Sequence, residues 1–115
     1  MNIIFGAGGH GCVVFDQLTS LGLSEIFFCD DNVETCLGYK VYKTFEIDFT
    51  KIEGAIVAIG DNNVRQKIVE QFNLNYINAI SKHSIISSMN VSIGCGVVVM
   101  PGAIININAK VGDHA

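Results

Sequence analysis

The chain has 115 residues, of which 50% are hydrophobic and 16% are charged, and its formal net charge is −4. This length allows one ordinary domain, or one small domain and a piece of another, and the hydrophobic content is sufficient for a core. The seven Lys and Arg residues form no cluster that could neutralise a run of phosphates, so no nucleic-acid partner is expected.

Targeting and metal-binding signals are also missing from the sequence. No apolar run approaches the ~20 residues that cross a bilayer, and no basic segment precedes the apolar N-terminus, so we expect a cytoplasmic protein without a membrane span. The cysteines show neither a Cys-x-x-Cys pair nor a zinc-like spacing, which predicts reduced, mostly buried thiols and no metal site. They are Cys12, Cys29, Cys36 and Cys95.

A glycine-rich loop follows the first expected strand, Asn2–Phe5. The loop is Gly6-Ala7-Gly8-Gly9-His10-Gly11, and a helix is expected to follow it over residues 10–21. Glycines leave backbone N–H groups uncovered, and a helix N-terminus adds free donors and the positive end of a dipole. The loop is therefore a candidate phosphate cradle. The helix residues expected to face the core are Val13, Val14, Leu18 and Leu21.

The segments that follow alternate between strand and helix patterns. A second buried strand is expected at 25–29, ending in the polar turn Asp30-Asp31-Asn32, and a third at 55–59. Residues 33–53 are less regular, with an edge strand possible at 38–42, and 75–77 could add a fourth strand to the sheet. Strands that alternate with helices in this way build parallel sheets. A second helix is expected over 63–72, with inward positions Val64, Ile68, Val69 and Phe72.

From residue 91 the hydrophobic period becomes six. One register holds Val91, Val97, Ala103, Ala109 and Ala115, and the second holds Ile93, Val99, Ile105 and Val111. Neither a helix, with period 3.6, nor a flat strand, with period 2, explains this spacing. A hexapeptide parallel β-helix does, because each six-residue piece forms one side of a triangular coil. Two ordinary hairpins rich in Val and Ile are the alternative.

With both halves in view, the chain resembles the bacterial sugar acyltransferases that include UDP-amino-sugar N-acetyltransferases and sialic-acid O-acetyltransferases of surface glycan biosynthesis. The resemblance covers essentially all 115 residues: the glycine loop, Asp30-Asp31, the segment 58–62 with Arg65, and the hexapeptides from about residue 85. It implies an α/β fold, with a small Rossmann-like parallel sheet domain (1–80) followed by the first coils of a left-handed parallel β-helix (81–115).

The resemblance also implies a set of ligands and site residues. It places Gly8, Gly9 and His10 at the diphosphate of a UDP-sugar, Asp30 and Asp31 at the uracil or ribose, and Asn62 and Arg65 near the sugar. Acetyl-CoA is the implied co-substrate, and a homotrimer is the implied assembly. Each residue has a plainer interpretation as well: a solvated turn for the two aspartates, a surface charge for Arg65 and a helix-start residue for His10.

The sequence leaves the catalytic chemistry open. Acetyl transfer needs a general base, and histidine suits that role, but the resemblance puts this base beyond Ala115. His114, at an expected coil corner, is the one local candidate. We therefore expect an incomplete chain of a longer acetyltransferase that lacks most of the acetyl-CoA site.

Two other functions fit parts of the sequence. The chain could be a non-catalytic UDP-sugar-binding module that associates through its short β-helix. The Gly-x-Gly-x-x-Gly pattern with Asp30 about twenty residues on also suggests an NAD oxidoreductase. However, about 78 residues precede the repeat, enough for one mononucleotide-binding half but not for two.

Overall fold

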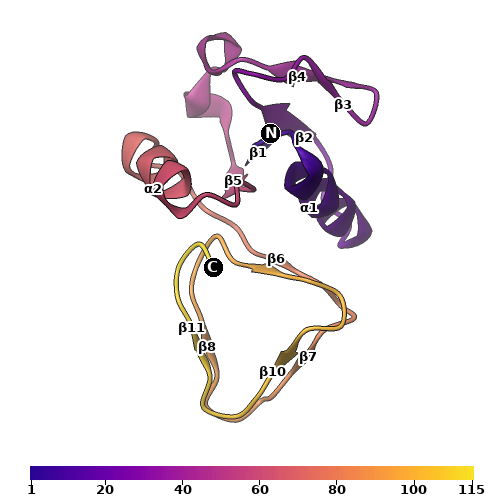
Figure 1. Cartoon of the computed structure of the whole chain (residues 1–115), viewed down its shortest axis with the longest axis vertical. Coiled ribbons are helices and arrows are strands. Elements are labelled where there is room, and N and C mark those ends of the chain that lie inside the picture. The colour runs from indigo at the N-terminus through magenta and orange to yellow at the C-terminus, as the bar shows by residue number, and fades with distance from the viewer.

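The computed structural model describes all 115 residues and shows two parts stacked along the longest axis of the molecule (Figure 1). One part is a twisted sheet with a helix on each face. The other is a triangular coil of short strands. Neither helix combines the length and the apolar character that crossing a membrane requires.

The sheet has five strands in the order β3-β4-β2-β1-β5. The central strand β1 (Asn2–Phe5) pairs in parallel with β2 (Ile26–Cys29) on one side and with β5 (Gly54–Val57) on the other. β4 (Tyr39–Tyr42) extends the parallel sheet beyond β2, while β3 (Thr35–Cys36) pairs with β4 as an antiparallel hairpin. The expected Rossmann-like sheet is confirmed, and the strand expected at 38–42 is present as β4, but it is not at the edge of the sheet because β3 pairs with its outer side.

The proposed fourth strand at 75–77 is reduced to one bridge, in which Tyr76 pairs with Ala55. Between β4 and β5 the chain makes two short 3₁₀ turns, η1 (Thr44–Glu46) and η2 (Phe49–Lys51). The segment that looked irregular in the sequence thus holds the β3–β4 hairpin followed by these two turns.

Helix α1 (Gly9–Ser20) covers one face of the sheet and α2 (Asn62–Gln71) covers the other. Val14 and Leu18 of α1 pack with Phe28 in one core cluster. On the opposite face, the Phe72 ring that ends α2 stacks on the rings of Phe5 and Phe49, at centroid distances of 5.3 and 4.6 Å.

Three of the expected core positions on the helices are wrong. Val13, Leu21 and Val64 have 38%, 44% and 42% of their surfaces exposed. The buried side of α1 differs from the expected one because the helix packs on two neighbours at once, the sheet and the coil below it. Gly11 and Gln17 are buried in place of Val13 and Leu21.

Six strands of two residues each form the β-helix. They are β6 (Ala79–Ile80), β7 (Ile85–Ile86), β8 (Ser92–Ile93), β9 (Val98–Val99), β10 (Ile104–Ile105) and β11 (Lys110–Val111). Every pair is parallel: β6 with β9, β7 with β10, and β8 with β11. Hairpins would give antiparallel pairs, so the hairpin alternative is wrong. The six strands build two triangular coils (Figure 1).

The first coil starts earlier than the six-residue repeat suggests. Ile80, Ile86 and Ile93 lie beside Val99, Ile105 and Val111 of the second coil. Six positions separate Ile80 from Ile86, but seven separate Ile86 from Ile93, and this extra residue interrupts the period. The division after residue 80 stays a prediction, although β6, which pairs within the β-helix, begins at Ala79.

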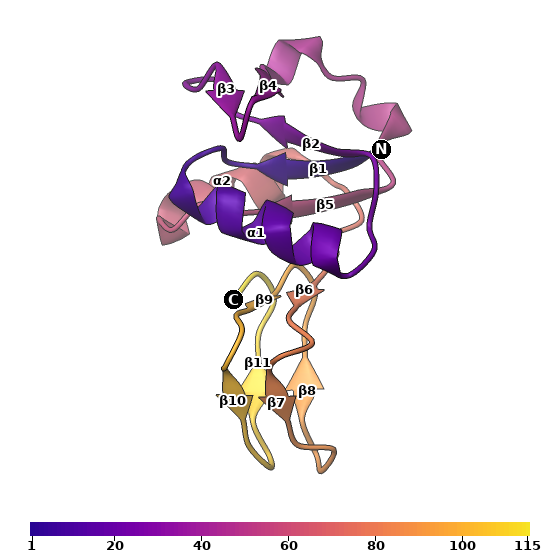
Figure 2. The ribbon, with the colours of Figure 1, turned by 90° about the vertical axis from the view of Figure 1, so that its right-hand side faces the viewer.

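Gln17 joins the two parts of the molecule. It is a buried residue of α1, the helix that rests on the upper edge of the β-helix (Figure 2). Its amide Nε2 donates to the carbonyl oxygens of Ala79 in the first coil and Val99 in the second, at 2.9 and 3.2 Å. The position of the sheet relative to the coils therefore depends on a buried polar contact.

Candidate functional site

The glycine-rich loop contains glycines of two kinds. Gly6 has φ +107°, and a Cβ there would lie 2.6 Å from the Ala58 carbonyl oxygen, while a Cβ on Gly11 would collide with the carbonyl oxygen of Gly6. Both are required by packing. A Cβ at Gly8 or Gly9 would meet no atom within 4 Å. These two glycines therefore form the open side of the loop.

Helix α1 begins at Gly9 without a side-chain cap on its first turn. The first N–H groups of a helix have no partner within the helix, and together with the dipole they favour an anion. Because Gly8 and Gly9 leave the approach open, the geometry here suits the oxygens of a phosphate group. His10 is exposed beside them.

Asp30 holds the glycine loop in place. Its Oδ2 accepts a hydrogen bond from the backbone N–H of Ala7 at 3.0 Å, and its Oδ1 accepts one from the N–H of Asn32 at 2.9 Å. The carboxylate that follows β2 thus links the end of that strand to the loop after β1. Each carboxylate oxygen keeps further acceptor capacity for a ligand.

Asp31 has a different set of partners. Its Oδ1 and Oδ2 accept from the backbone N–H and the hydroxyl of Thr44, at 2.8 and 3.1 Å. Asp31 therefore holds Thr44, the first residue of η1, close to the carboxyl end of β2. Thr44 comes from the irregular segment and carries no motif, so sequence reasoning missed it.

A cleft of about 280 Å³ opens at the carboxyl ends of β1 and β2, between these ends and α2. Its lining combines apolar side chains, among them Ile59 and Phe72, with both aspartates of the turn. Ligands of open α/β sheets bind at this end of the strands. Its lining residues are Phe5, Gly6, Cys29, Asp30, Asp31, Asn32, Thr44, Ile59, Val64, Ile68, Gln71 and Phe72.

Cys29 in this cleft is not an activated nucleophile. It is 2% exposed, and burial raises the pKa of its thiol from 9.0 to about 11, despite the opposing hydrogen bond with Thr44. The thiolate form is the reactive one, and it is scarce at neutral pH.

Arg65 and Asn62 lie at the N-terminal end of α2, and Arg65 organises the loop before it. Its Nη2 donates to the Asn62 side-chain oxygen at 2.6 Å, and its Nη1 donates to the Ile59 carbonyl at 2.9 Å. The guanidinium is therefore more than a free surface charge. Asp61 caps the helix by accepting from two backbone N–H groups of its first turn.

A smaller cavity of about 190 Å³ lies where the glycine loop, the loop after β5 and the second coil meet. His10, Arg65 and His114 all line it, together with Met100. Asn62, Arg65 and His114 also line an adjoining hollow of about 310 Å³. The structure thus gathers the predicted sugar-side residues at the junction of the two parts, while both aspartates line the cleft at the carboxyl ends of β1 and β2.

His114 sits at a coil corner, as expected, with φ +61°. Its ring contacts the Tyr76 ring edge-on, at a centroid distance of 4.8 Å, and its Nδ1 is buried without a hydrogen-bond partner. A bound polar group or water could satisfy that nitrogen.

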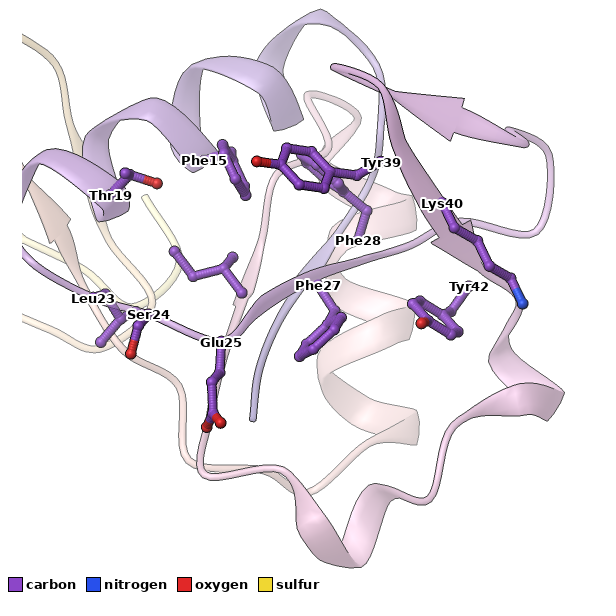
Figure 3. Close-up of a pocket in the computed structure, with 11 residues that line it drawn as sticks. Phe15, Thr19, Leu23, Ser24, Glu25, Phe27, Phe28, Tyr39, Lys40 and Tyr42 are labelled. Carbon is purple, nitrogen blue, oxygen red and sulfur yellow. The ribbon is translucent and has the colours of Figure 1, made fainter.

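A separate cavity of about 370 Å³ lies beside the first half of β2, next to α1 and β4 (Figure 3). Phe15, Phe28 and Tyr39 gather on one side of it, and none of the predicted site residues lines it. The positions of the predicted residues therefore favour the carboxyl ends of the strands, and not this aromatic hollow, as the ligand site.

Comparison with known proteins gives one family and several solved structures. A model of the PglD N-terminal domain family matches residues 3–72. A histidine variant of perosamine N-acetyltransferase from Caulobacter crescentus, in complex with CoA and GDP-perosamine, is 31% identical with a TM-score of 0.87, covering 98% of this chain and 57% of that one. The structure of PerB from the same organism, with the same ligands, has the same identity and TM-score and is covered over 56% of its length.

A second solved protein is the acetyltransferase domain of PglB from Neisseria gonorrhoeae. It is 28% identical with a TM-score of 0.86, and the match covers 98% of this chain and 59% of that one. The same domain in complex with acetyl coenzyme A matches with a TM-score of 0.72. The chain therefore spans just over half the length of most of the structures it matches.

Proposed function

Because the chain belongs to the PglD N-terminal domain family, we propose that it forms the nucleotide-sugar-binding part of an acyl-CoA-dependent sugar acetyltransferase. The main supporting observation is that the glycine loop reaches both cavities: Gly6 lines the cleft at the ends of β1 and β2, His10 lines the cavity that reaches the second coil, and the open residues Gly8 and Gly9 connect them along the chain. One extended ligand can then run from the sheet to the β-helix.

In this proposal each part of the ligand has its own place. The N–H groups at Gly8 and Gly9 receive the diphosphate, with His10 as an additional donor. The base and ribose occupy the cleft, where Asp30 and Asp31 accept hydrogen bonds from ribose hydroxyls or ring N–H groups. The sugar lies towards Asn62 and Arg65, and Arg65 acts mainly by holding the loop that shapes this cavity.

The proposal allows either of two nucleotide bases, uracil or guanine. The family resemblance favours a UDP-sugar, whereas the PerB structure holds GDP-perosamine. Carboxylates that accept from ring N–H groups can serve either base, because both uracil and guanine carry such donors. The proposed acceptor is the amine of an amino sugar or the hydroxyl of a sialic acid.

For acetyl transfer, a general base must remove a proton from the acceptor as it attacks the thioester of acetyl-CoA. We propose that most of this machinery, including the acetyl-CoA site between subunits of a trimer, lies on further coils. His114 is the histidine of this chain that lines the cavity from the β-helix side, and it stays a candidate for the base.

Calorimetry with UDP, GDP and their amino-sugar conjugates tests the binding half of this proposal. We expect one site per chain and a preference for one base, with the sugar conjugate binding more tightly than the free diphosphate. Absence of binding by every ligand at about 1 mM, where even a weak site of ~4 kcal/mol is detected, would overturn it.

Acetyl transfer is tested separately by following CoA release with the preferred sugar. Binding together with transfer supports the complete activity, and loss of transfer in His114→Gln would assign the base. Binding without any transfer by these 115 residues agrees both with the non-catalytic module and with a general base on further coils, and transfer by a chain extended with further six-residue repeats would support the acetyltransferase. NADH binding tighter than either diphosphate would favour the oxidoreductase alternative.

A further inference from the structure

Two cysteines that are distant in the sequence meet where the β3–β4 hairpin rests on α1. Cys12 Sγ and Cys36 Sγ are 2.9 Å apart, and neither is in a disulfide. A disulfide bond holds its sulfurs at ~2.05 Å, so an approach of about 0.9 Å would join them. Cys12 lies on the helix that follows the glycine loop, and Cys36 lies on the edge strand β3.

A second contact keeps these sulfurs together. Cys36 and Tyr39 face each other across the hairpin, and Cys12 and Phe15 lie one turn apart on the same side of α1. The Tyr39 and Phe15 rings pack with centroids 5.4 Å apart (Figure 3). Two adjacent side-chain pairs therefore join the same two elements, and the hairpin cannot move away from α1 without breaking both.

The four thiols differ in how an oxidant can reach them. Cys12 is partly exposed, whereas Cys36, which belongs to the hairpin, is only 6% exposed. Cys29 is buried against Thr44 and Cys95 is exposed in the β-helix, and neither contacts another sulfur. A small oxidant would thus reach Cys12 first and find a second thiol already in contact with it.

We propose that Cys12 and Cys36 form a reversible intramolecular disulfide, with a low-molecular-weight disulfide such as glutathione disulfide as the oxidant. The Cys12 thiolate attacks one glutathione sulfur, which forms a mixed disulfide and releases one glutathione. Cys36 then loses its proton and attacks the Cys12 sulfur, which releases the second glutathione. The two protein thiols give up two electrons and two protons, and the oxidant becomes two glutathione molecules.

The second step has a distinct pH dependence. Burial, and then the contact with Cys12, raises the pKa of the Cys36 thiol from 9.0 to about 11. The attacking species is the thiolate, so closure of the mixed disulfide accelerates about tenfold per pH unit below the pKa of the Cys36 thiol, which burial alone still raises above 9.0 once Cys12 carries glutathione. Reduction with excess glutathione or dithiothreitol restores both thiols.

The test incubates the chain with glutathione disulfide, blocks free thiols with iodoacetamide and digests on the carboxyl side of glutamate. This digestion is needed because no Lys or Arg precedes position 40, so trypsin would leave three cysteines in one peptide. Cleavage after Glu25, Glu34 and Glu46 puts Cys12 in 1–25, Cys29 in 26–34 and Cys36 in 35–46. Mass spectrometry then identifies each thiol separately.

We expect a cross-linked product of 1–25 with 35–46, and a Tm at least about 5 °C higher for the oxidised chain. The cross-link must disappear in Cys36→Ser, which keeps Cys12 as a glutathione adduct, and must persist in Cys29→Ser. Cys95 reports that the oxidant is active, because this exposed thiol becomes glutathionylated. Full modification of Cys95 with no cross-link between Cys12 and Cys36 would overturn the proposal.

Discussion

Gln17 donates a hydrogen bond from its side-chain amide to the carbonyl oxygen of Ala79 over 2.9 Å, which ties helix α1 to the first strand of the β-helix. The same nitrogen reaches Val99 in the second coil. Gln17 is 4% exposed, and its Oε1 accepts no hydrogen bond. One amide therefore contacts both coils, in addition to the apolar packing of Ala79 against α1 and the sheet.

Replacing this donor with an acceptor should be costly. In Gln17→Glu a buried carboxylate would face two carbonyl oxygens, and we expect the free energy of unfolding to fall by about 2 kcal/mol or more at pH 7. The folded-state pKa of this glutamate should be raised, so the lost stability should return as the pH falls towards the unfolded value of ~4.3. Urea titrations at several pH values measure both effects.

Gln66→Glu is the matched control, because Gln66 is exposed on α2 and bonds only to Glu70. Its effect should stay within about 0.5 kcal/mol. Equal effects of the two variants would show that the Gln17 contact between the sheet and the coils makes no particular contribution to the free energy of unfolding.

The two kinds of glycine in the loop should respond differently to alanine. Gly6→Ala should lower the free energy of unfolding by about 2 kcal/mol or more, since the site combines φ +107° with a backbone oxygen 2.6 Å from the added carbon. Gly9→Ala should leave stability unchanged or raise it by ~0.5 kcal/mol, because its surroundings are open and α1 begins there.

Nucleotide binding provides a second test of the glycine loop. The methyl group of Gly9→Ala would stand on the side from which a diphosphate approaches, so calorimetry should show at least about tenfold weaker nucleotide binding by a fully folded protein, a change of ~1.4 kcal/mol. Unchanged affinity in that variant would move the diphosphate away from the loop.

Asp30 should matter for the order of the glycine loop. Asp30→Asn leaves one uncharged accepting oxygen where two carboxylate oxygens accept from the N–H groups of Ala7 and Asn32, and we expect a loss of about 1–2 kcal/mol. Hydrogen exchange at the Ala7 amide should accelerate while exchange at Thr44 stays constant.

Asp31→Asn should produce the reverse pattern, because Asp31 accepts from Thr44 and not from the loop. Exchange that accelerates at both amides in both variants would contradict separate roles for the two aspartates.

Alkaline stability should depend on Cys29. Its folded-state pKa is raised from 9.0 to about 11 by burial, so the stabilisation from the neutral thiol is complete below pH 9 and is lost as the pH rises through 11. The expected slope in that window is about 1 kcal/mol per pH unit for this group. Cys29→Ala should make the dependence of unfolding free energy on pH less steep by this amount and leave the part that comes from Cys36, whose pKa is also raised to about 11.

Val57→Ala supplies the comparison, since it opens a space in the same core cluster without removing a titrating group. It should lower the whole curve and keep its slope. If both variants flatten the curve equally, the slope does not come from the thiol.

Local patterns were sufficient to predict much of this fold. The apolar runs at β1, β2 and β5 are short, bounded by turns and alternate with helices, which favours a parallel sheet. The double register of six from Val91 predicted parallel coils, because it specifies both the period and the inward positions. The loop at Gly6–Gly11 was predicted as a cradle from its composition alone.

Contacts between distant segments were harder to predict. The buried side of α1 includes Gln17, a polar residue whose partners lie more than sixty positions away, so hydrophobicity pointed to Val13 and Leu21 instead. Thr44 reaches the site through Asp31 from a segment without periodicity. The four thiols also differ, with Cys29 and Cys36 buried and Cys95 exposed, which only tertiary packing decides.

The seven-residue step between Ile86 and Ile93 has a practical consequence. The coil absorbs one additional residue between β7 and β8, yet both strands keep their parallel partners in the second coil. This corner includes Asn90, in the left-handed region at φ +54°, whose side-chain amide bonds to Asn108 one coil further on. Exposed Ser88 and Met89 precede it. Short peptide tags or spectroscopic labels inserted between Ser88 and Met89 should therefore leave the neighbouring strands in register.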